Sequence, residues 1–142
     1  MSDYDNSHHT KRNGDLGVYK AISDLHQKGY IVNDPLTEHA PFDLVIWRDC
    51  VAKTVQVKYR SKDESGKIEV RFRRTQWNTN GSYNEDVDKE PIDLYCVYCP
   101  DTDECYYFDP DQFNKSIALR IDSPKNNQTK GVKMATDFRQ VP

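Results

Sequence analysis

The sequence predicts a single α/β domain in which an N-terminal helix precedes a mixed, mostly antiparallel sheet and short helices follow. Two observations predict this class. Apolar residues with helical spacing are found in one early segment, and several short strand-like segments separated by turn residues come after it. With 142 residues and 36% hydrophobic content, the chain can bury one core. We therefore expect one folded domain with trailing segments.

The helix is predicted over residues 15–28. Its apolar residues Val18, Ala21, Ile22 and Leu25 recur at the spacing that places them on one helical face, and a glycine follows as a stop signal.

Strands are predicted where short apolar or alternating segments lie between turn residues. In chain order, these segments are residues 30–32, 42–47, 52–60, 67–73, 92–99, 105–108 and 117–121. Turn residues 48–50 and 100–103 predict that the strands on either side of them form hairpins. The strand 67–73 alternates charged with apolar side chains, which gives it one buried and one basic face.

Two further segments lie between these strands. Residues 76–90 are rich in Asn, Gly and acidic residues and have no apolar period, which predicts a loop. Asp109 is expected to cap a short helix that begins at Pro110.

The domain is expected to span residues 14–122, between a flexible arm, 1–13, and a basic polar extension, 123–142. No apolar stretch approaches the roughly 20 residues that span a bilayer, and the polar start lacks the apolar centre of a secretory signal. We expect a cytoplasmic protein with no membrane partner.

The four cysteines include Cys96 and Cys99, whose C-x-x-C spacing occurs in zinc sites. On the predicted strand 92–99 these two side chains would point to opposite faces. We therefore expect reduced structural thiols, and a metal role for the cysteines stays open.

The net charge of −3 conceals a strong segregation of charge along the chain. Residues 53–75 carry eight basic and three acidic side chains, whereas residues 83–111 carry one basic and ten acidic side chains. Residues 112–142 are basic again, with six basic and two acidic side chains. Local basic faces can hold phosphate backbones whatever the net charge, although a solvated face is the simpler interpretation.

Polar groups with metal-binding chemistry lie on the first predicted hairpin. Asp43 leads into one strand, and Gln56 and Lys58 lie two residues apart on the other, so both project from the same face. An Asp carboxylate and an amide or backbone oxygen suit Mg²⁺, and an ammonium can orient water or stabilise charge during phosphodiester hydrolysis. The same pattern is also typical of an ordinary hairpin whose polar side chains face water.

Several of these segments, in this order, resemble the PD-(D/E)xK nuclease superfamily, and within it the small homing endonucleases encoded in group I introns of bacteria, notably cyanobacteria. The resemblance spans most of the chain. It is carried by Gly14-Asp15-Leu16-Gly17, Asp24-Leu25, Lys28-Gly29-Tyr30, Pro41-Phe42-Asp43-Leu44, Val55-Gln56-Val57-Lys58-Tyr59-Arg60, the strand 93–100, Leu119-Arg120-Ile121 and the segment 124–128.

The resemblance implies a restriction-endonuclease-like core that cleaves double-stranded DNA with Mg²⁺, or with Mn²⁺ as a substitute. Asp43, Gln56 and the Val57 carbonyl would bind the ion, and Lys58 would position the attacking water. The products would be a 5′-phosphate and a 3′-hydroxyl. Gln at position 56 resembles the intron-encoded variant and gives the metal one negative charge fewer than Asp or Glu would.

The first helix departs from this family's pattern. Relatives commonly place a Glu a few residues after the glycine, where this chain has Val18. Asp15, one helical turn earlier, could supply the missing carboxylate or could only favour the helix N-terminus. This departure bears on catalytic competence more than on DNA binding.

DNA recognition would fall to the basic strand, its flanks and the tail. The candidate DNA-binding residues are Arg60, Lys62, Arg71, Arg73, Arg74, Lys125, Lys130 and Lys133. Because one active centre cuts one strand, we expect a homo-oligomer, either a dimer or a tetramer. The alternatives are a structure-specific nuclease of the Holliday junction resolvase type, a catalytically impaired DNA-binding relative, and an interaction domain with no nucleic-acid role.

Overall fold

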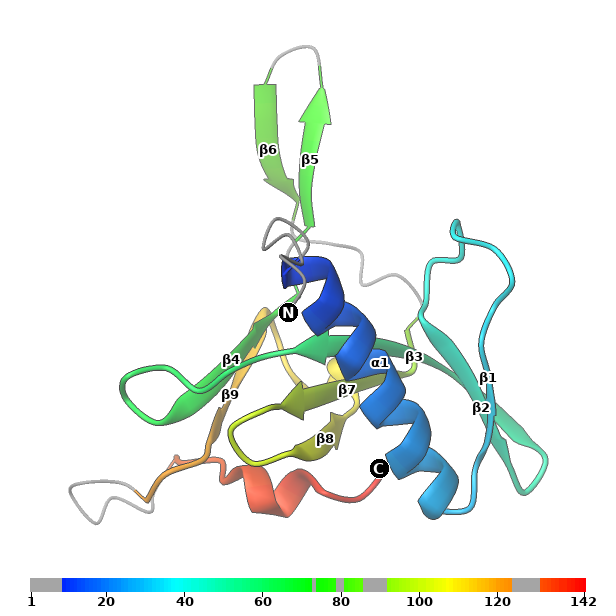
Figure 1. The fold of residues 1–142 in the computed structure, drawn as a ribbon. Coiled ribbons are helices and arrows are strands. Elements are labelled where there is room, and N and C mark those ends of the chain that lie inside the picture. The colour runs from blue at the N-terminus through cyan, green and yellow to red at the C-terminus, as the bar shows by residue number, and fades with distance from the viewer. Residues whose placement is uncertain (1–8, 73, 79–80, 86–91, 124–130) are drawn as a thin grey trace, which may run out of the picture.

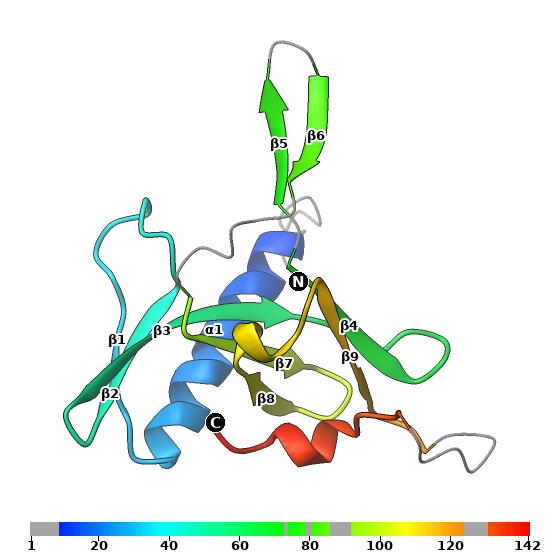
Figure 2. The same cartoon turned by 180° about the vertical axis from the view of Figure 1, so that it is seen from behind.

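The computed structural model describes residues 9–72, 74–78, 81–85, 92–123 and 131–142. It confirms the predicted class. Helix α1 (His9–Gln27) lies across one face of a five-stranded sheet, and a two-stranded ribbon lies on the other face (Figures 1 and 2). The helix begins at His9 rather than at residue 15, so residues 9–13 of the predicted arm are helical. No helix-breaking proline precedes Gly14, and Asn13 contacts His9 at 3.3 Å, the spacing of one helical turn.

The five-stranded sheet has the order β1-β2-β3-β7-β8. Its strands are β1 (Ile31–Asn33), β2 (Leu44–Arg48), β3 (Val51–Tyr59), β7 (Leu94–Cys99) and β8 (Glu104–Phe108). Neighbouring strands are antiparallel except β3 and β7, which run parallel. Both predicted hairpins are confirmed. Asp49 and Cys50 form the β2–β3 turn with φ of 53° and 65°, the conformation of a two-residue type I′ turn.

The two faces of this sheet bury separate cores. On the α1 side, Leu44, Val55 and Val57 pack against Ala21 and Leu25 of the helix. On the other side, β4 (Lys67–Arg71) pairs with β9 (Ser116–Arg120), and apolar residues of this ribbon pack on β7 and β8. Cys96 belongs to the first core and Cys99 to the second, so their thiols lie on opposite faces, as strand alternation predicts.

Short 3₁₀ helices complete the ribbon side. The helix η2 (Pro110–Gln112) begins after Asp109, whose side chain accepts a hydrogen bond from the Asp111 N–H at 2.9 Å. This confirms the predicted cap. The helix η3 (Ala135–Phe138) contributes Ala135 to the second core. No described helix has the length and apolar composition needed to cross a membrane.

Polar contacts fix how α1 is rotated about its axis. Lys20 Nζ lies 2.8 Å from Asp103 in the β7–β8 turn, and the Tyr107 hydroxyl donates a hydrogen bond to Asp24. Successive helical residues are about 100° apart around the axis, so Val18 lies on the opposite flank from Lys20. The Val18 flank therefore faces away from the β7–β8 turn.

One prediction is wrong. Residues 76–90 were expected to form a loop, but β5 (Arg74–Asn78) and β6 (Gly81–Glu85) form an antiparallel hairpin that stands away from the main sheet (Figures 1 and 2). Residues 79–80 and 86–90 of the predicted loop lie outside the described residues. The polar composition gave no strand signal, because a hairpin that projects from the core buries no face of its own and does not require alternating apolar residues. The dipeptide Asn80-Gly81, typical of hairpin turns, is the signal that could have found it.

Two glycines differ sharply in the space around them. Gly66, in the turn before β4, has φ of +82°, and a Cβ there would lie 2.6 Å from a carboxylate oxygen of Asp122. Its carbonyl oxygen also accepts hydrogen bonds from the N–H groups of Ile121 and Asp122. Gly14 lies inside α1, and a Cβ added there would meet no described atom within 4 Å beyond the helix's own backbone.

We therefore expect Gly66→Ala to lower the free energy of unfolding by about 1–3 kcal/mol, since it adds left-handed backbone strain and a steric clash. Gly14→Ala should raise it by about 0.5–1 kcal/mol through helix propensity. Urea denaturation followed by tryptophan fluorescence measures both. A Gly66→Ala protein as stable as the wild type would contradict the turn geometry.

Candidate active site at the open edge of β3

The pairing register leaves part of β3 without a partner on the β2 side. The last pair between these strands joins Leu44 to Val55, so residues 56–59 extend past the start of β2. Pro41 lies where the chain would otherwise continue this pairing, and proline has no N–H to offer a neighbouring strand. We call residues 56–59, on the side facing β2, the open edge.

Backbone groups of alternate residues point toward the open edge. In a strand, the N–H and C=O of one residue face the same neighbour, and the next residue faces the other. The Val55 carbonyl accepts a hydrogen bond from the Asp43 N–H at 2.9 Å, so it faces β2. The Arg60 N–H donates to the Tyr98 carbonyl of β7 at 3.0 Å. Val57 and Tyr59 therefore direct their backbone groups to the open edge.

The Asp43 carboxylate takes the place of a backbone partner at this edge. Its Oδ2 accepts hydrogen bonds from the Val57 N–H at 2.8 Å and from the Gln56 amide Nε2 at 3.0 Å. The structure thus brings together Asp43, Gln56 and Val57 from two strands, and the carboxylate end is oriented by two donors. Hydrogen bonds to a charged acceptor each contribute about 1.5–3 kcal/mol, so these two bonds hold the Asp43 carboxylate in one orientation.

Three oxygens of this group accept no hydrogen bond from the described residues and are candidates to bind a cation. They are Asp43 Oδ1, Gln56 Oε1 and the Val57 carbonyl oxygen. An all-oxygen set of one carboxylate, one amide and one backbone carbonyl suits a hard ion such as Mg²⁺, which keeps several waters. In the described part of the chain, no three His, Cys, Asp or Glu side chains cluster to hold a metal. The candidate centre therefore depends on neutral ligands beside its one carboxylate.

Lys58 lies on the same strand face as Gln56 and is half-buried. Burial lowers the pKa of its ammonium group, the nearby Arg60 charge lowers it further, and the Asp43 carboxylate opposes both effects. The ammonium is therefore within electrostatic reach of Asp43 and Arg60. A partly desolvated cation in this position can orient a water molecule or stabilise negative charge.

The first helix does not bring a carboxylate into contact with these groups. Val18 is half-buried and packs against the core beneath α1. Asp15, one turn earlier on the same flank, is exposed and lies in the interior of α1 rather than in its first turn. The interpretation of Asp15 as a residue of the helix N-terminus is therefore wrong, because α1 starts at His9. Its role as an auxiliary ligand stays a prediction.

The predicted DNA-binding residues are found in different settings. Arg60 lies beside the candidate centre, with its Nη1 donating to the Tyr59 carbonyl at 2.8 Å. Lys62 Nζ pairs with Asp122 at 3.3 Å. Lys133 lies over the Phe113 ring. Arg73, Lys125 and Lys130 lie outside the described residues, as does the side chain of Arg74.

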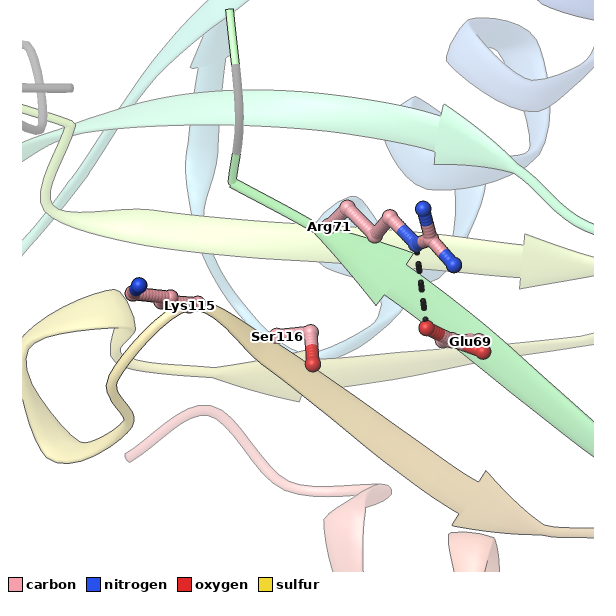
Figure 3. A pocket seen from close by; sticks show the side chains of 4 residues that line it. All are labelled: Glu69, Arg71, Lys115 and Ser116. Carbon is pink, nitrogen blue, oxygen red and sulfur yellow. Dashed lines mark hydrogen bonds and ion pairs between the residues drawn. The ribbon is translucent and has the colours of Figure 1, made fainter. Parts of the chain in front are cut away.

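Arg71 lies on the outer, solvent-facing side of the β4–β9 ribbon. Its Nε lies 3.1 Å from Glu69 Oε1, and the Arg71 side chain is 71% exposed. Figure 3 shows the guanidinium turned toward Glu69, with Ser116 and Lys115 across the ribbon. These four residues line a shallow pocket of about 330 Å³. A surface ion pair of this kind is weak, so Glu69 holds Arg71 loosely.

The sequence predicted that Asp43, Gln56 and Lys58 lie together, and the structure brings them together, but two features of the candidate site were missed. The first is the open edge itself, which follows from the β2–β3 register and from Pro41. The second is that Arg60 lies beside Lys58 rather than on a remote basic surface. Alternation along β3 was the available signal, because Gln56, Lys58 and Arg60 are spaced two apart.

Comparisons with known proteins show the family and the fold of this chain. The family model of the PD-(D/E)XK endonucleases matches residues 8–141. The fold is similar to the solved structure of a bacterial homing endonuclease, I-Ssp6803I, with a TM-score of 0.70 and 24% sequence identity over 92% of this chain and 88% of that one. At this identity the structural likeness shows a shared fold. No curated protein sequence gives a significant match.

Replacing Gln56 by Glu tests the oxygen cluster. The substitution removes the amide donor to Asp43 and places two carboxylates together, so the free energy of unfolding without divalent ions should fall by about 1–2 kcal/mol. The added charge should tighten Mn²⁺ binding at least about fivefold, an increase of about 1 kcal/mol. Denaturation and titration calorimetry measure the two effects.

Gln112→Glu, at an exposed position of η2, is the matched control and should change neither quantity. If the folded Gln56→Glu protein bound Mn²⁺ no more tightly than the wild type, the amide oxygen would not be a ligand.

Proposed function

The chain belongs to the PD-(D/E)XK endonuclease family, and we propose that it is a Mg²⁺-dependent, site-specific endonuclease that cleaves double-stranded DNA, of the intron-homing type. Nucleases of this family generally use divalent metal ions. The observation that carries the proposal is the Asp43 carboxylate, which two hydrogen bonds hold beside the Gln56 amide and the Val57 carbonyl. The similar fold of a bacterial homing endonuclease favours the homing role.

Asp43, Gln56 and Val57 would hold the ion through Asp43 Oδ1, Gln56 Oε1 and the Val57 carbonyl oxygen. A bound divalent ion would supply Lewis-acid polarisation of the phosphate and a lowered pKa for a bound water. The set has a single negative charge, so waters and the substrate phosphate would fill the other positions. Mn²⁺, which also accepts oxygen ligands, is an expected substitute.

Lys58 would orient the attacking water from the same strand face. The water oxygen forms a new bond to phosphorus, and the bond between phosphorus and the 3′ oxygen breaks. The attacking water loses one proton, and the departing 3′ oxygen gains one. The products are a 5′-phosphate and a 3′-hydroxyl. Because Lys58 is half-buried, its ammonium would act in a drier environment than an exposed lysine would.

The flank of α1 that carries Asp15 and Val18 faces away from the β7–β8 turn. Asp15 would serve as an auxiliary carboxylate through a bound water, since its side chain is exposed one turn before Val18. A protein whose helix carboxylate reaches the metal only through a water would bind the metal less tightly than a protein with a carboxylate at position 18.

DNA would contact basic residues of the chain, of which Arg60 lies beside the site and Arg71 lies on the ribbon. The proposed contacts are Arg60, Lys62, Arg71, Arg73, Arg74, Lys125 and Lys130. A chain with one active centre cuts one strand, so a double-strand break calls for a dimer or tetramer with two-fold symmetry. A Holliday junction resolvase activity would differ by preferring four-way junctions to linear duplexes.

The wild-type protein should cleave DNA only when Mg²⁺ or Mn²⁺ is present, in assays on linear duplex, supercoiled and four-way junction DNA. Asp43→Ala and Lys58→Ala should each lower the cleavage rate by at least about 10³-fold, since one removes the charged ligand and the other the water-orienting cation. Lys53→Ala, at the other end of β3, is the control. Undiminished Mg²⁺-dependent cleavage by either active-site variant would disprove the mechanism.

Glu69→Gln tests whether the outer face of the ribbon binds DNA. Freeing Arg71 from its carboxylate should tighten DNA binding about two- to fivefold, the equivalent of a weak surface ion pair. Fluorescence anisotropy in Ca²⁺ at several salt concentrations measures this. Asp137→Asn, which makes the same change of charge on the exposed part of η3, should have a smaller effect. Equal effects of the two substitutions would indicate only a change in net charge.

A further inference from the structure

Arg60 follows directly after β3 and reaches back to the open edge. Its Nη1 donates a hydrogen bond to the Tyr59 carbonyl at 2.8 Å. That carbonyl faces the same edge as the Val57 carbonyl, because the two residues are two apart on one strand. Two residues of strand span about 6.7 Å. The guanidinium is thus anchored beside the proposed metal ligands, and one of its five N–H donors is used to anchor it.

The charges around this edge are unbalanced. Asp43 carries one negative charge, whereas Lys58 and Arg60 carry two positive charges on the same strand face, and both cations are half-buried. Arg60 lies near enough to Lys58 for the two positive charges to repel each other. Holding two cations together costs free energy in the unbound protein. An anion that enters between them would remove this cost.

Arg60 also differs from the exposed cations nearby. Lys62 pairs with Asp122, and Arg71 pairs with Glu69. Among the described residues, no carboxylate forms an ion pair with Arg60. Its guanidinium therefore keeps donors available for a ligand from outside the chain. A planar pair of N–H donors matches the two non-bridging oxygens of a phosphodiester.

We propose that Arg60 is a catalytic residue whose guanidinium binds the non-bridging oxygens of the scissile phosphate and stabilises the negative charge that develops there in the transition state. This inference rests on the proposed endonuclease function and assigns Arg60 a role distinct from general contact with the DNA backbone. It also fits the neutral Gln56, because Asp43, Lys58 and Arg60 together then carry one net positive charge toward the substrate.

The two roles of Arg60 predict different kinetics. A residue that acts on the transition state changes the rate of the bound complex, whereas a backbone contact changes affinity and its dependence on salt. Arg60→Ala should therefore lower the single-turnover cleavage rate at saturating enzyme by about 10²–10³-fold, as for the loss of one oxyanion donor. The dissociation constant for DNA in Ca²⁺ should change by less than about threefold, under 1 kcal/mol.

The experiment measures both quantities for the wild type, Arg60→Ala and Arg60→Lys on whichever DNA the wild type cleaves. Guanidinium chloride at millimolar concentration should partly restore cleavage by Arg60→Ala, which a merely structural role would not allow. Arg60→Lys should retain intermediate activity because it keeps the charge without the planar donors. Arg48→Ala, at the β2–β3 turn, is the control and should cleave at the wild-type rate.

Each outcome decides between the claims. A wild type that cleaves no DNA with Mg²⁺ or Mn²⁺ overturns the proposed function, and this inference with it. A wild type that cleaves, together with an Arg60→Ala protein of unchanged single-turnover rate, overturns the Arg60 role alone. A loss confined to affinity, without rescue by guanidinium, overturns it too and makes Arg60 a backbone contact.

Discussion

The Asp43 carboxylate determines how the site is built. It lies just before the first residue of β2, and it accepts a hydrogen bond at the unpaired edge of β3. By accepting the Val57 N–H, it supplies the hydrogen bond that a further residue of β2 would have made. Pro41 keeps that further pairing from forming. As a result, backbone carbonyls at this edge of β3 point to a side that has no neighbouring strand. The Val57 N–H at the same edge still has a hydrogen-bond acceptor, the Asp43 carboxylate.

The electrostatic character of the site follows from this geometry. A single carboxylate, oriented by Gln56 and Val57, faces a row of side chains in which Lys58 and Arg60 are both positive. Such a row is unfavourable in isolation and favourable when a phosphodiester and its developing charge occupy it. Under the proposed mechanism, a neutral Gln56 would weaken metal binding and make the environment of the phosphate more positive.

Much of the fold follows from local patterns in the sequence, whereas the site depends on how the strands are aligned. The β2–β3 and β7–β8 hairpins, the Asp109 cap and the apolar face of α1 follow from turn residues and periodicity. Convergence of Asp43 with Gln56 follows from the first hairpin. The parallel pairing of β3 with β7 and the extension of β3 past β2 are tertiary features, and local propensity carries no signal for them.

The most direct test of the account is to locate a bound ion. In a crystal soaked with Mn²⁺, anomalous scattering should give a peak about 2.0–2.3 Å from Asp43 Oδ1, Gln56 Oε1 and the Val57 carbonyl oxygen, with waters in the other positions. A peak bound elsewhere, with these three oxygens unliganded at saturating Mn²⁺, would contradict the central claim that the open edge of β3 is the metal centre.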